Sequence, residues 1–524
     1  MLNKKDQNGF AIVYGLVVLF LVTLGGMSLL YISEKDKESS IDYSKMRDAA
    51  MLSKAAHSAF VGQCEKEPNF VIALLDSFSS DSKYKWLFNN SISESVNEKR
   101  ISLWSGSDAP SFSARIMKYD TSEFIIQIEG RGFGGLGGQK KTTGIYKLEG
   151  IKREVPFPSH ALFLGSGFGN CDRPLTINGD VFAGGNSHIN SSSSDIVVNG
   201  NFKTGTDDFS SNKRIIVNGK SYFRGNVKFQ GYNPVFNGKT GIKGKVDIDV
   251  APQVNGDLYL NGTHAGNSSI NVGAGPYVAK YVNGRFNPGK INVTAPAVKE
   301  AQGSDIDLAS ELQMADVDDE PPSLKSNLES YIQSKGGTVY NVSSLGLNFN
   351  TPGWNLDTAY SNSMYSKWNG FLVIKVTGNL NLNAFGNTFN GKAIWILDGV
   401  NFNAQKWYSS APNSNTMIYL KNGARFNDFS FGDSKTFRGV IYNESSEQSQ
   451  YKFGDNSEFR GSIIHTGSSR TQFQSGSSTA EIRYDKSVID EYKDLGLLSA
   501  PSSFKEIVIL EDIRIRPQLL GLSF

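Results

Sequence analysis

A dipeptide that returns at a nearly constant interval constrains the fold of this 524-residue chain more than any other feature. After residue 174, Asn-Gly follows a large apolar residue at Asn178, Asn199, Asn218, Asn237 and Asn255. The intervals between successive copies are 21, 19, 19 and 18 residues. Asn and Gly both tolerate positive φ, so each copy indicates a tight turn. Unrelated hairpins also use Asn-Gly but need no constant interval, so the spacing predicts successive coils of a β-solenoid.

A second repeat lies nearer the C-terminus. The nine residues FGDSKTFRG (431–439) return 22 residues later as FGDNSEFRG (453–461), and each copy runs into an apolar strand. Phe473 and Ile482 fit a degenerate third copy. We interpret the repeat as stacked coils that place Phe437 beside Phe459, and Phe431 beside Phe453, inside the solenoid. The two repeats predict one solenoid block over 156–296 and a second over 346–495, followed by a C-terminal segment, 496–524.

Residues 297–345 differ in character from both blocks. Two stretches with short-helical character, 297–312 and 324–334, flank the acidic run 316–320 and the pair Pro321-Pro322. We interpret this region as a helical, acidic linker or insertion. Its carboxylates could bind Ca²⁺, but their spacing matches no known calcium loop, so we expect a solvated run of charge and no metal site.

The N-terminus carries a segment long enough to cross a membrane. No charge occurs from Phe10 to Ile32, and these residues would form a helix of about 35 Å, against a hydrocarbon core of about 30 Å. The run is too long for a typical signal peptide. Lys4 and Lys5 favour a cytoplasmic N-terminus. We therefore expect a single-pass protein of the inner membrane with its C-terminal part outside.

Beyond the membrane segment, apolar residues recur every three or four positions as far as Phe60, which predicts one helix over 10–62. A short basic leader (1–9), then Gly9-Phe10, then such a helix resembles a type IV pilin. The resemblance implies cleavage after Gly9 and N-methylation of Phe10. Most pilins have Glu where this chain has Tyr14, and the pattern GFAIV…LVTLGGM is more similar to the PilX-type N-terminal domain. A plain, uncleaved signal anchor is the alternative.

Residues 63–155 contain two alternating, strand-like runs and are expected to form a small pilin-like β region. Gly132, Gly134 and Gly137 match the spacing of a dinucleotide-binding fingerprint, but no helix follows to bind a phosphate, so we interpret them as a hairpin connection. PilX-like proteins similarly have a strand, a loop and a second strand here. The FRG-x-I pattern that ends near Asp485 resembles the β-rich C-terminal domain often found behind PilX-type N-termini. The expected fold class is thus α+β to mainly β: a long pilin-like helix, a small β region and an extended β-solenoid.

Composition removes several classes of function. With 53 Lys and Arg against 51 Asp and Glu, the chain has no electrostatic footprint for nucleic acid. The five His residues are scattered, so no metal site and no cofactor is expected. Cys64 and Cys171 could form one disulfide outside the membrane or remain two buried thiols.

Enzyme and scaffold are the competing functions. Solenoid enzymes that cleave polysaccharide need paired carboxylates, and Asp247 with Asp249, or Asp305 with Asp307, would supply them. Neither pair has a basic partner in its own segment, so we expect no enzyme. Trp354, Trp368 and Trp407 are candidates for exposed, ligand-facing aromatics.

The sequence therefore favours a non-enzymatic, pilin-like surface protein, either a minor pilin or a pilus-associated subunit, with a β-solenoid head for filament assembly or adhesion. Its expected partners are the membrane through residues 10–32, other pilin-like subunits, and a surface or polysaccharide ligand. The alternative is a membrane-tethered solenoid enzyme acting on polysaccharide.

Overall fold

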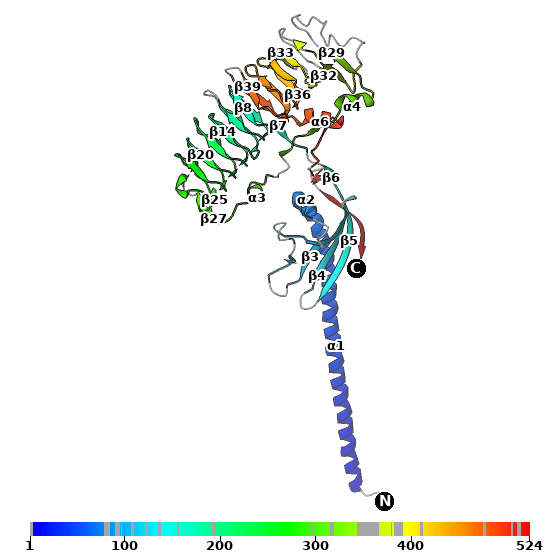
Figure 1. Cartoon of the computed structure of the whole chain (residues 1–524). Helices are drawn as coiled ribbons and strands as arrows, with labels where there is room; N and C mark the ends of the chain where they lie inside the picture. The colour runs from blue at the N-terminus through cyan, green and yellow to red at the C-terminus, as the bar shows by residue number, and fades with distance from the viewer. Residues whose placement is uncertain are drawn as a thin grey trace. The chain divides into compact units, whose positions relative to one another are not determined.

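The computed structural model divides the chain into two compact units, shown in Figure 1. Unit 1 comprises Met1–Pro156 and Lys505–Phe524, and unit 2 is Phe157–Phe504. The predicted fold class, a long N-terminal helix followed by a small β region and a β-solenoid, is confirmed. The structure describes the whole chain except residues 1–3, 78–83, 90–94, 96, 106–108, 121–122, 135–137, 155–156, 191–194, 295–296, 315–318, 343–365, 379, 382–390, 409–411, 475–477, 503, 505–506, 511–514 and 524.

Unit 1 is a long helix with an antiparallel sheet packed on its last third. The helices are α1 (Lys4–Lys66) and α2 (Pro68–Asp76). The sheet has the order β1-β3-β4-β5-β43, with β2 beside β3. Its strands are β1 (Lys85–Trp86), β2 (Ile101–Ser102), β3 (Ser111–Asp120), β4 (Ile125–Phe133), β5 (Gln139–Glu149) and β43 (Arg516–Ser523). A separate two-stranded ribbon pairs β6 (Ile151–Glu154) with β42 (Ile507–Leu510).

The glycines that resemble a nucleotide fingerprint have a packing role. Gly130 and Gly132 lie in β4, and Gly134 follows it. A Cβ atom on any of the three would collide with a backbone carbonyl oxygen of α1, those of Ser53, Ala49 and Lys45 in turn. These helix residues are four apart and the glycines two apart, so one turn of helix matches one two-residue repeat of the strand face. The predicted hairpin connection is therefore wrong for Gly132, because this residue lies inside strand β4. Its lack of a side chain lets the backbone of α1 lie directly on the strand.

Unit 2 is a β-solenoid made of two blocks of parallel strands. Block 1 contains β7 (His160–Leu164), β8 (Phe168–Cys171), β9 (Leu175–Asn178), β10 (Asp180–Ala183), β11 (Ser187–Ile189), β12 (Ile196–Val198), β13 (Phe202–Thr204), β14 (Phe209–Ser211), β15 (Ile215–Val217), β16 (Ser221–Phe223), β17 (Val227–Phe229), β18 (Val235–Phe236), β19 (Thr240–Ile242), β20 (Val246–Ile248), β21 (Gln253–Val254), β22 (Leu258–Leu260), β23 (His264–Gly266), β24 (Ile270–Val272), β25 (Val278–Val282), the short 3₁₀ helix η2 (Pro288–Lys290), β26 (Ile291–Val293) and β27 (Val298–Gln302).

Block 2 has longer strands, and a helix and a short strand follow it. It contains β29 (Val339–Val342), β30 (Phe371–Val376), β31 (Leu380–Asn381), β32 (Lys392–Asp398), β33 (Asn401–Trp407), β34 (Asn415–Lys421), β35 (Arg425–Phe431), β36 (Thr436–Asn443), β37 (Gln450–Lys452), β38 (Glu458–His465), β39 (Thr471–Gln474) and β40 (Ala480–Arg483), and is followed by α6 (Lys486–Asp494) and β41 (Leu498–Ser499).

The stacking predicted for the FGD repeat is confirmed. β36 and β38 pair in parallel, with Phe437 opposite Phe459 and Gly439 opposite Gly461. The two Phe rings are buried and stacked, with centroids 5.6 Å apart. The rings of Phe431 and Phe453 lie 4.8 Å apart in the same core.

The two sequence repeats form a single row of the solenoid. β40 pairs with β9 so that Ile482 lies opposite Ile177 and Arg483 opposite Asn178. The Arg-Gly corners of block 2 and the Asn-Gly corners of block 1 are thus the same structural position. Glycine is needed there because a Cβ would strike the glycine carbonyl of the adjacent coil, as at Gly200 and Gly461. Four hydrogen bonds link the five Asn side chains into an amide ladder, in which the Nδ2 of Asn199 and of each later Asn donates to the Oδ1 of the preceding one at 2.6–2.8 Å. Asn178, the first of the five, donates instead to Glu481 of block 2.

The order of the coils along the solenoid axis is a circular permutation of their order along the chain. β38 pairs in parallel with β7, and β40 with β9, so the last coils of block 2 stack on the first coils of block 1. One hydrophobic core runs through both blocks. The chain therefore starts the solenoid in its middle, winds through block 1 to one end, passes to the other end, and winds through block 2 back to the middle.

Residues 303–338, here called the strap, connect the far ends of the two blocks. The strap contains α3 (Leu308–Leu312), β28 (Ser323–Leu324) and α4 (Leu328–Ser334), while 298–302, expected to be helical, forms strand β27. Leu308 and Leu312 pack on outward-facing Tyr222 and Tyr259 of block 1. On α4, Glu329 forms ion pairs with Lys375 (2.8 Å) and Lys421 (2.6 Å) of block 2.

The acidic run of the strap is not simply solvated. Asp319 forms ion pairs with buried Lys203, at 2.8 Å, and with Arg224. Asp316 to Asp318 lie outside the described residues. The expectation of a solvated run is therefore wrong for Asp319, because the strap carries this carboxylate onto a basic row of block 1.

Candidate functional site

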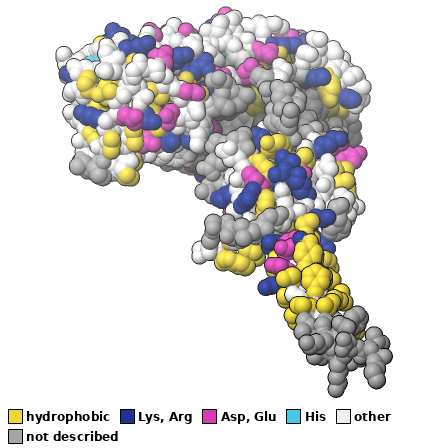
Figure 2. Space-filling model, turned by 90° about the horizontal axis from the view of Figure 1, so that it is seen from below, with side chains coloured by type: hydrophobic (Ala, Val, Ile, Leu, Met, Phe, Trp, Pro, Cys, Tyr) yellow, Lys and Arg dark blue, Asp and Glu magenta, His cyan; other side chains and the backbone are white. Residues whose placement is uncertain are grey.

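The apolar half of α1 is the most conspicuous exposed surface of unit 1. Every described side chain from Val13 to Ile32 is exposed, and no charge occurs among them. Figure 2 shows hydrophobic side chains covering the surface of this part of the helix. Within the described chain, α1 is the one helix long and apolar enough to span a membrane. A surface of this kind is stable only in lipid or against other apolar helices.

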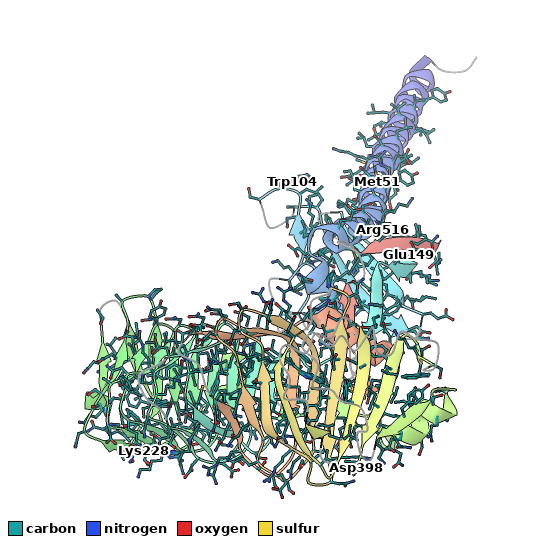
Figure 3. All side chains as sticks on the ribbon, turned by 90° about the horizontal axis from the view of Figure 1, so that it is seen from above. Met51, Trp104, Glu149, Lys228, Asp398 and Arg516 are labelled. Atoms are coloured by element: carbon teal, nitrogen blue, oxygen red, sulfur yellow. The ribbon has the colours of Figure 1, made fainter. Side chains whose placement is uncertain are left out.

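The other half of α1 has two distinct faces. Ala49, Leu52, Ala56 and Phe60 are buried against the sheet. Met51 lies on the opposite face, 65% exposed, and is labelled in Figure 3. Tyr43 is also exposed. Apolar residues on the face that the chain's own sheet leaves uncovered are suited to contacts with another helix.

The predicted processing site lies within α1. Gly9 and Phe10 belong to this helix, and their side chains are outside the described set. Cleavage between them stays a prediction.

A half-buried polar cluster links two strands of the unit 1 sheet. Arg115 and Arg131 both donate to Glu129 Oε1, at 3.0 and 2.6 Å. Burial opposes ionisation of Glu129, but the hydrogen bonds from Arg131 and Arg115 outweigh it, so the pKa of Glu129 is lowered. Against the helix, His57 Nε2 lies 3.1 Å from Thr142 Oγ1, and burial lowers the pKa of His57. Both groups therefore have structural partners within unit 1.

Both cysteines are free thiols. Cys64 is buried in the core of unit 1, and Cys171 is buried in the core of the solenoid. Burial raises the pKa of each thiol. Of the two alternatives left open by the sequence, the structure shows two buried thiols, because each cysteine lies in the core of its own unit.

The tryptophans predicted to face a ligand do not do so where the structure describes them. Trp407 is buried in the solenoid core, and Trp368 is buried beneath the strap. Trp354 lies outside the described residues. Trp104, which was not predicted, is 59% exposed and follows exposed Leu103 at an edge of the unit 1 sheet (Figure 3). The Ser-Gly-Ser-Asp run directly after Trp104 was the available signal, because such a run indicates a surface loop.

Two of the four aspartates considered for catalysis form ion pairs with basic residues outside their own segments. Asp249 lies 3.8 Å from Lys228, and Asp305 lies 2.6 Å from Arg285. Asp307 caps α3 by accepting a hydrogen bond from the Ser310 amide. Asp247 lines a shallow groove beside Lys228 and Lys245. Partners missing from the local sequence are thus supplied by the stacking of coils.

A polar groove of about 490 Å³ crosses the coils where the two blocks meet. Its floor includes Glu458 and Glu481, which lie opposite each other in adjacent strands. Arg483 bridges them, with contacts of 3.1 Å to Glu458 and 2.6 Å to Glu481. Arg460 also lies 2.9 Å from Glu458, so guanidinium groups offset the charge of both carboxylates in this groove. Among the described residues, no group of three or more acidic, His or Cys side chains could hold a metal ion.

No protein-family model matches the sequence, and no curated protein matches it. Among solved structures, the competence-associated pilin ComZ from Thermus thermophilus is similar at 11% identity, over 91% of this chain and 98% of that chain, with a TM-score of 0.32. A score this low does not define a shared fold, so the match to ComZ assigns no family or function.

Proposed function

We propose that this chain is a pilin-like surface protein that is anchored or assembled through α1 and carries the solenoid as its exposed head. The observation that supports this most is the division of α1 into two halves. One half is uncharged, exposed and long enough to span a membrane, and the other is seated on the glycine face of β4. The N-terminal motif Gly9-Phe10 and the PilX-type pattern in the sequence favour a minor pilin or pilus-associated subunit.

The orientation follows from charge. Lys4 and Lys5 precede the apolar run, which favours an N-terminus on the cytoplasmic side and both units outside the inner membrane. We propose that other pilin-like subunits cover the free face of α1, and that the solenoid head meets a surface or polysaccharide ligand.

Processing is the first test. In cells with a prepilin peptidase, mass spectrometry should find a mature protein that begins at Phe10. Gly9→Val should block cleavage, because a side chain there obstructs the peptidase, whereas the control Gly15→Val should still be processed. Exported wild-type protein with an intact Met1 would replace the pilin-like proposal with a plain signal anchor.

Assembly is the second test. Met51→Lys should leave the fold intact, since Met51 is exposed, but should exclude the protein from sheared surface filaments. Tyr232→Lys is the matched control, because Tyr232 is also a large exposed side chain but lies in the solenoid. Equal incorporation of both variants would argue against helix-mediated assembly.

The enzymatic alternative has its own test. We expect the wild-type protein to release no products from a panel of polysaccharides. Release that is abolished by Asp247→Asn would instead make the protein a membrane-tethered solenoid enzyme.

A further inference from the structure

We infer that unit 1 can be completed only after the solenoid has folded, because its last strand is delivered by the chain that leaves the solenoid. This inference concerns the fold alone and does not rest on the pilin-like function.

The C-terminal segment is part of unit 1, although about 350 residues separate it from the strands that it pairs with. β43 forms the edge of the sheet beside β5, from Arg516 opposite Glu149 to Ser523 opposite Thr143. Ile515 is fully buried in the core of unit 1. β42 pairs with β6 in the adjoining ribbon. Without this segment the sheet loses an edge strand and the core loses an apolar side chain.

An unfolded solenoid would not bring the segment to its site. An unfolded chain of about 350 residues has a radius of gyration of roughly 70 Å. In that state β42 and β43 would rarely meet β6 and β5.

The folded solenoid holds its two ends together. Phe157, its first residue, and Leu495 both pack against one hydrophobic cluster, and Lys493 Nζ lies 5.8 Å from the centre of the Phe157 ring. The hydroxyl of Tyr484 donates to the carbonyl of Pro158 at 3.4 Å. Two residues then connect Phe157 to β6, and eleven connect Leu495 to β42. A short connection of this kind gives an effective concentration in the mM range.

The circular permutation is what makes this delivery possible. The coils repeat about every 4.8 Å, so a row of more than a dozen coils spans about 60 Å. A solenoid wound from one end to the other would hold its first and last residues that far apart. Because β38 and β40 stack on β7 and β9, both ends lie at the same coils, and the strap carries the chain between the distant ends.

Hydrogen exchange of the full chain in detergent micelles tests the inference. A chain that stops after Phe504 defines how fast the β5 amides exchange without β43. The double variant Gly439→Val and Gly461→Val should prevent the coils from stacking, since each added side chain meets a backbone carbonyl of the preceding coil. We expect its β5 amides to exchange as fast as in the truncated chain, although β43 is present.

A linker variant tests the same point with the solenoid folded. About 40 Gly/Ser residues inserted after Phe504 should lower the effective concentration of β43 and speed β5 exchange at least about tenfold. The same insertion at the Gly284 turn, where nothing packs on the glycine, is the control and should leave β5 protected. Wild-type protection of β5 in either the glycine variant or the Phe504 linker variant would overturn the inference. Both results are independent of processing and filament assembly, so they do not test the proposed function.

Discussion

At the scale of single residues, burial in the solenoid changes the chemistry of polar side chains. His465 is fully buried, with Nδ1 2.8 Å from Thr471 Oγ1, and burial lowers its pKa to about 4. Its folded pKa is below the unfolded value of about 6.5, so the folded state binds fewer protons between these values. The stabilisation is fully present above about pH 6.5 and is lost as the pH falls to about 4.

We therefore predict that the solenoid loses roughly 3 kcal/mol of unfolding free energy between pH 6.5 and pH 4 through His465. Urea unfolding across this range measures the loss. His465→Gln should flatten the slope in this window, whatever it does to stability at pH 8. An unchanged slope in the variant would show that His465 is not the titrating group.

Arg173 is a second buried residue with a specific role at the junction of the blocks. It is fully buried in block 1 and donates to the carbonyls of Phe453, Gly454 and Ser478 in block 2. Arg173→Met should cost about 2–4 kcal/mol, because it leaves buried acceptors without donors. Arg460→Met is the control, since Arg460 is exposed and its ion pair with Glu458 is worth little. Urea midpoints of the two variants should differ clearly, and equal midpoints would mean that Arg173 does not join the blocks.

At the scale of elements, the contact between α1 and β4 depends on the absence of side chains. Gly132→Ala should cost about 2 kcal/mol, because the new methyl group meets the Ala49 carbonyl and the helix must move away. Gly62→Ala adds the same methyl group to α1 where nothing lies within 4 Å, and should be neutral or stabilising by up to about 1 kcal/mol. Denaturant titration followed by labelling of Cys64 measures both. Equal effects would mean that α1 does not lie on the glycine face.

At the scale of the whole molecule, the two free thiols report on two separate cores. Cys64 and Cys171 are each fully buried, one in each unit. We predict that both are unreactive toward a thiol reagent in native, unreduced protein and react in urea at two different midpoints. Cys64→Ser and Cys171→Ser assign each midpoint to its unit. A failure of either cysteine to react in fully denatured, unreduced protein would reveal a disulfide.

Much of this architecture was readable from the sequence because it depends on local chemistry. Asn178 and its equivalents marked the corners of successive coils, since tight turns need residues that tolerate unusual φ. Phe437 and Phe459 were placed in one stack because identical side chains at a fixed interval can align in a parallel coil. The apolar run from Phe10 to Ile32 was evident for a similar reason, as length and absence of charge alone suffice to span a membrane.

The ligand-facing surface was harder to predict. Trp368 and Trp407 lie in β-rich segments where a large aromatic side chain suits core and surface equally well. α4 covers Trp368, and the neighbouring coils enclose Trp407. The exposure of Trp104 was not predicted, because the exposure of a side chain depends on what packs against it rather than on the residue type.

By itself, the sequence determined that this chain has a membrane-length helix and a β-solenoid with rows of stacked apolar residues. Only the tertiary structure decided that block 2 precedes block 1 along the axis, that the strap returns the chain, and that β43 completes unit 1. Turn chemistry and hydrophobic periodicity act over a few residues, whereas the contacts that set this order join residues some 300 positions apart, such as Ile463 and Leu162. Any coil presents nearly the same edge to any other, so the order of stacking depends on which ends must meet and which apolar faces must be covered.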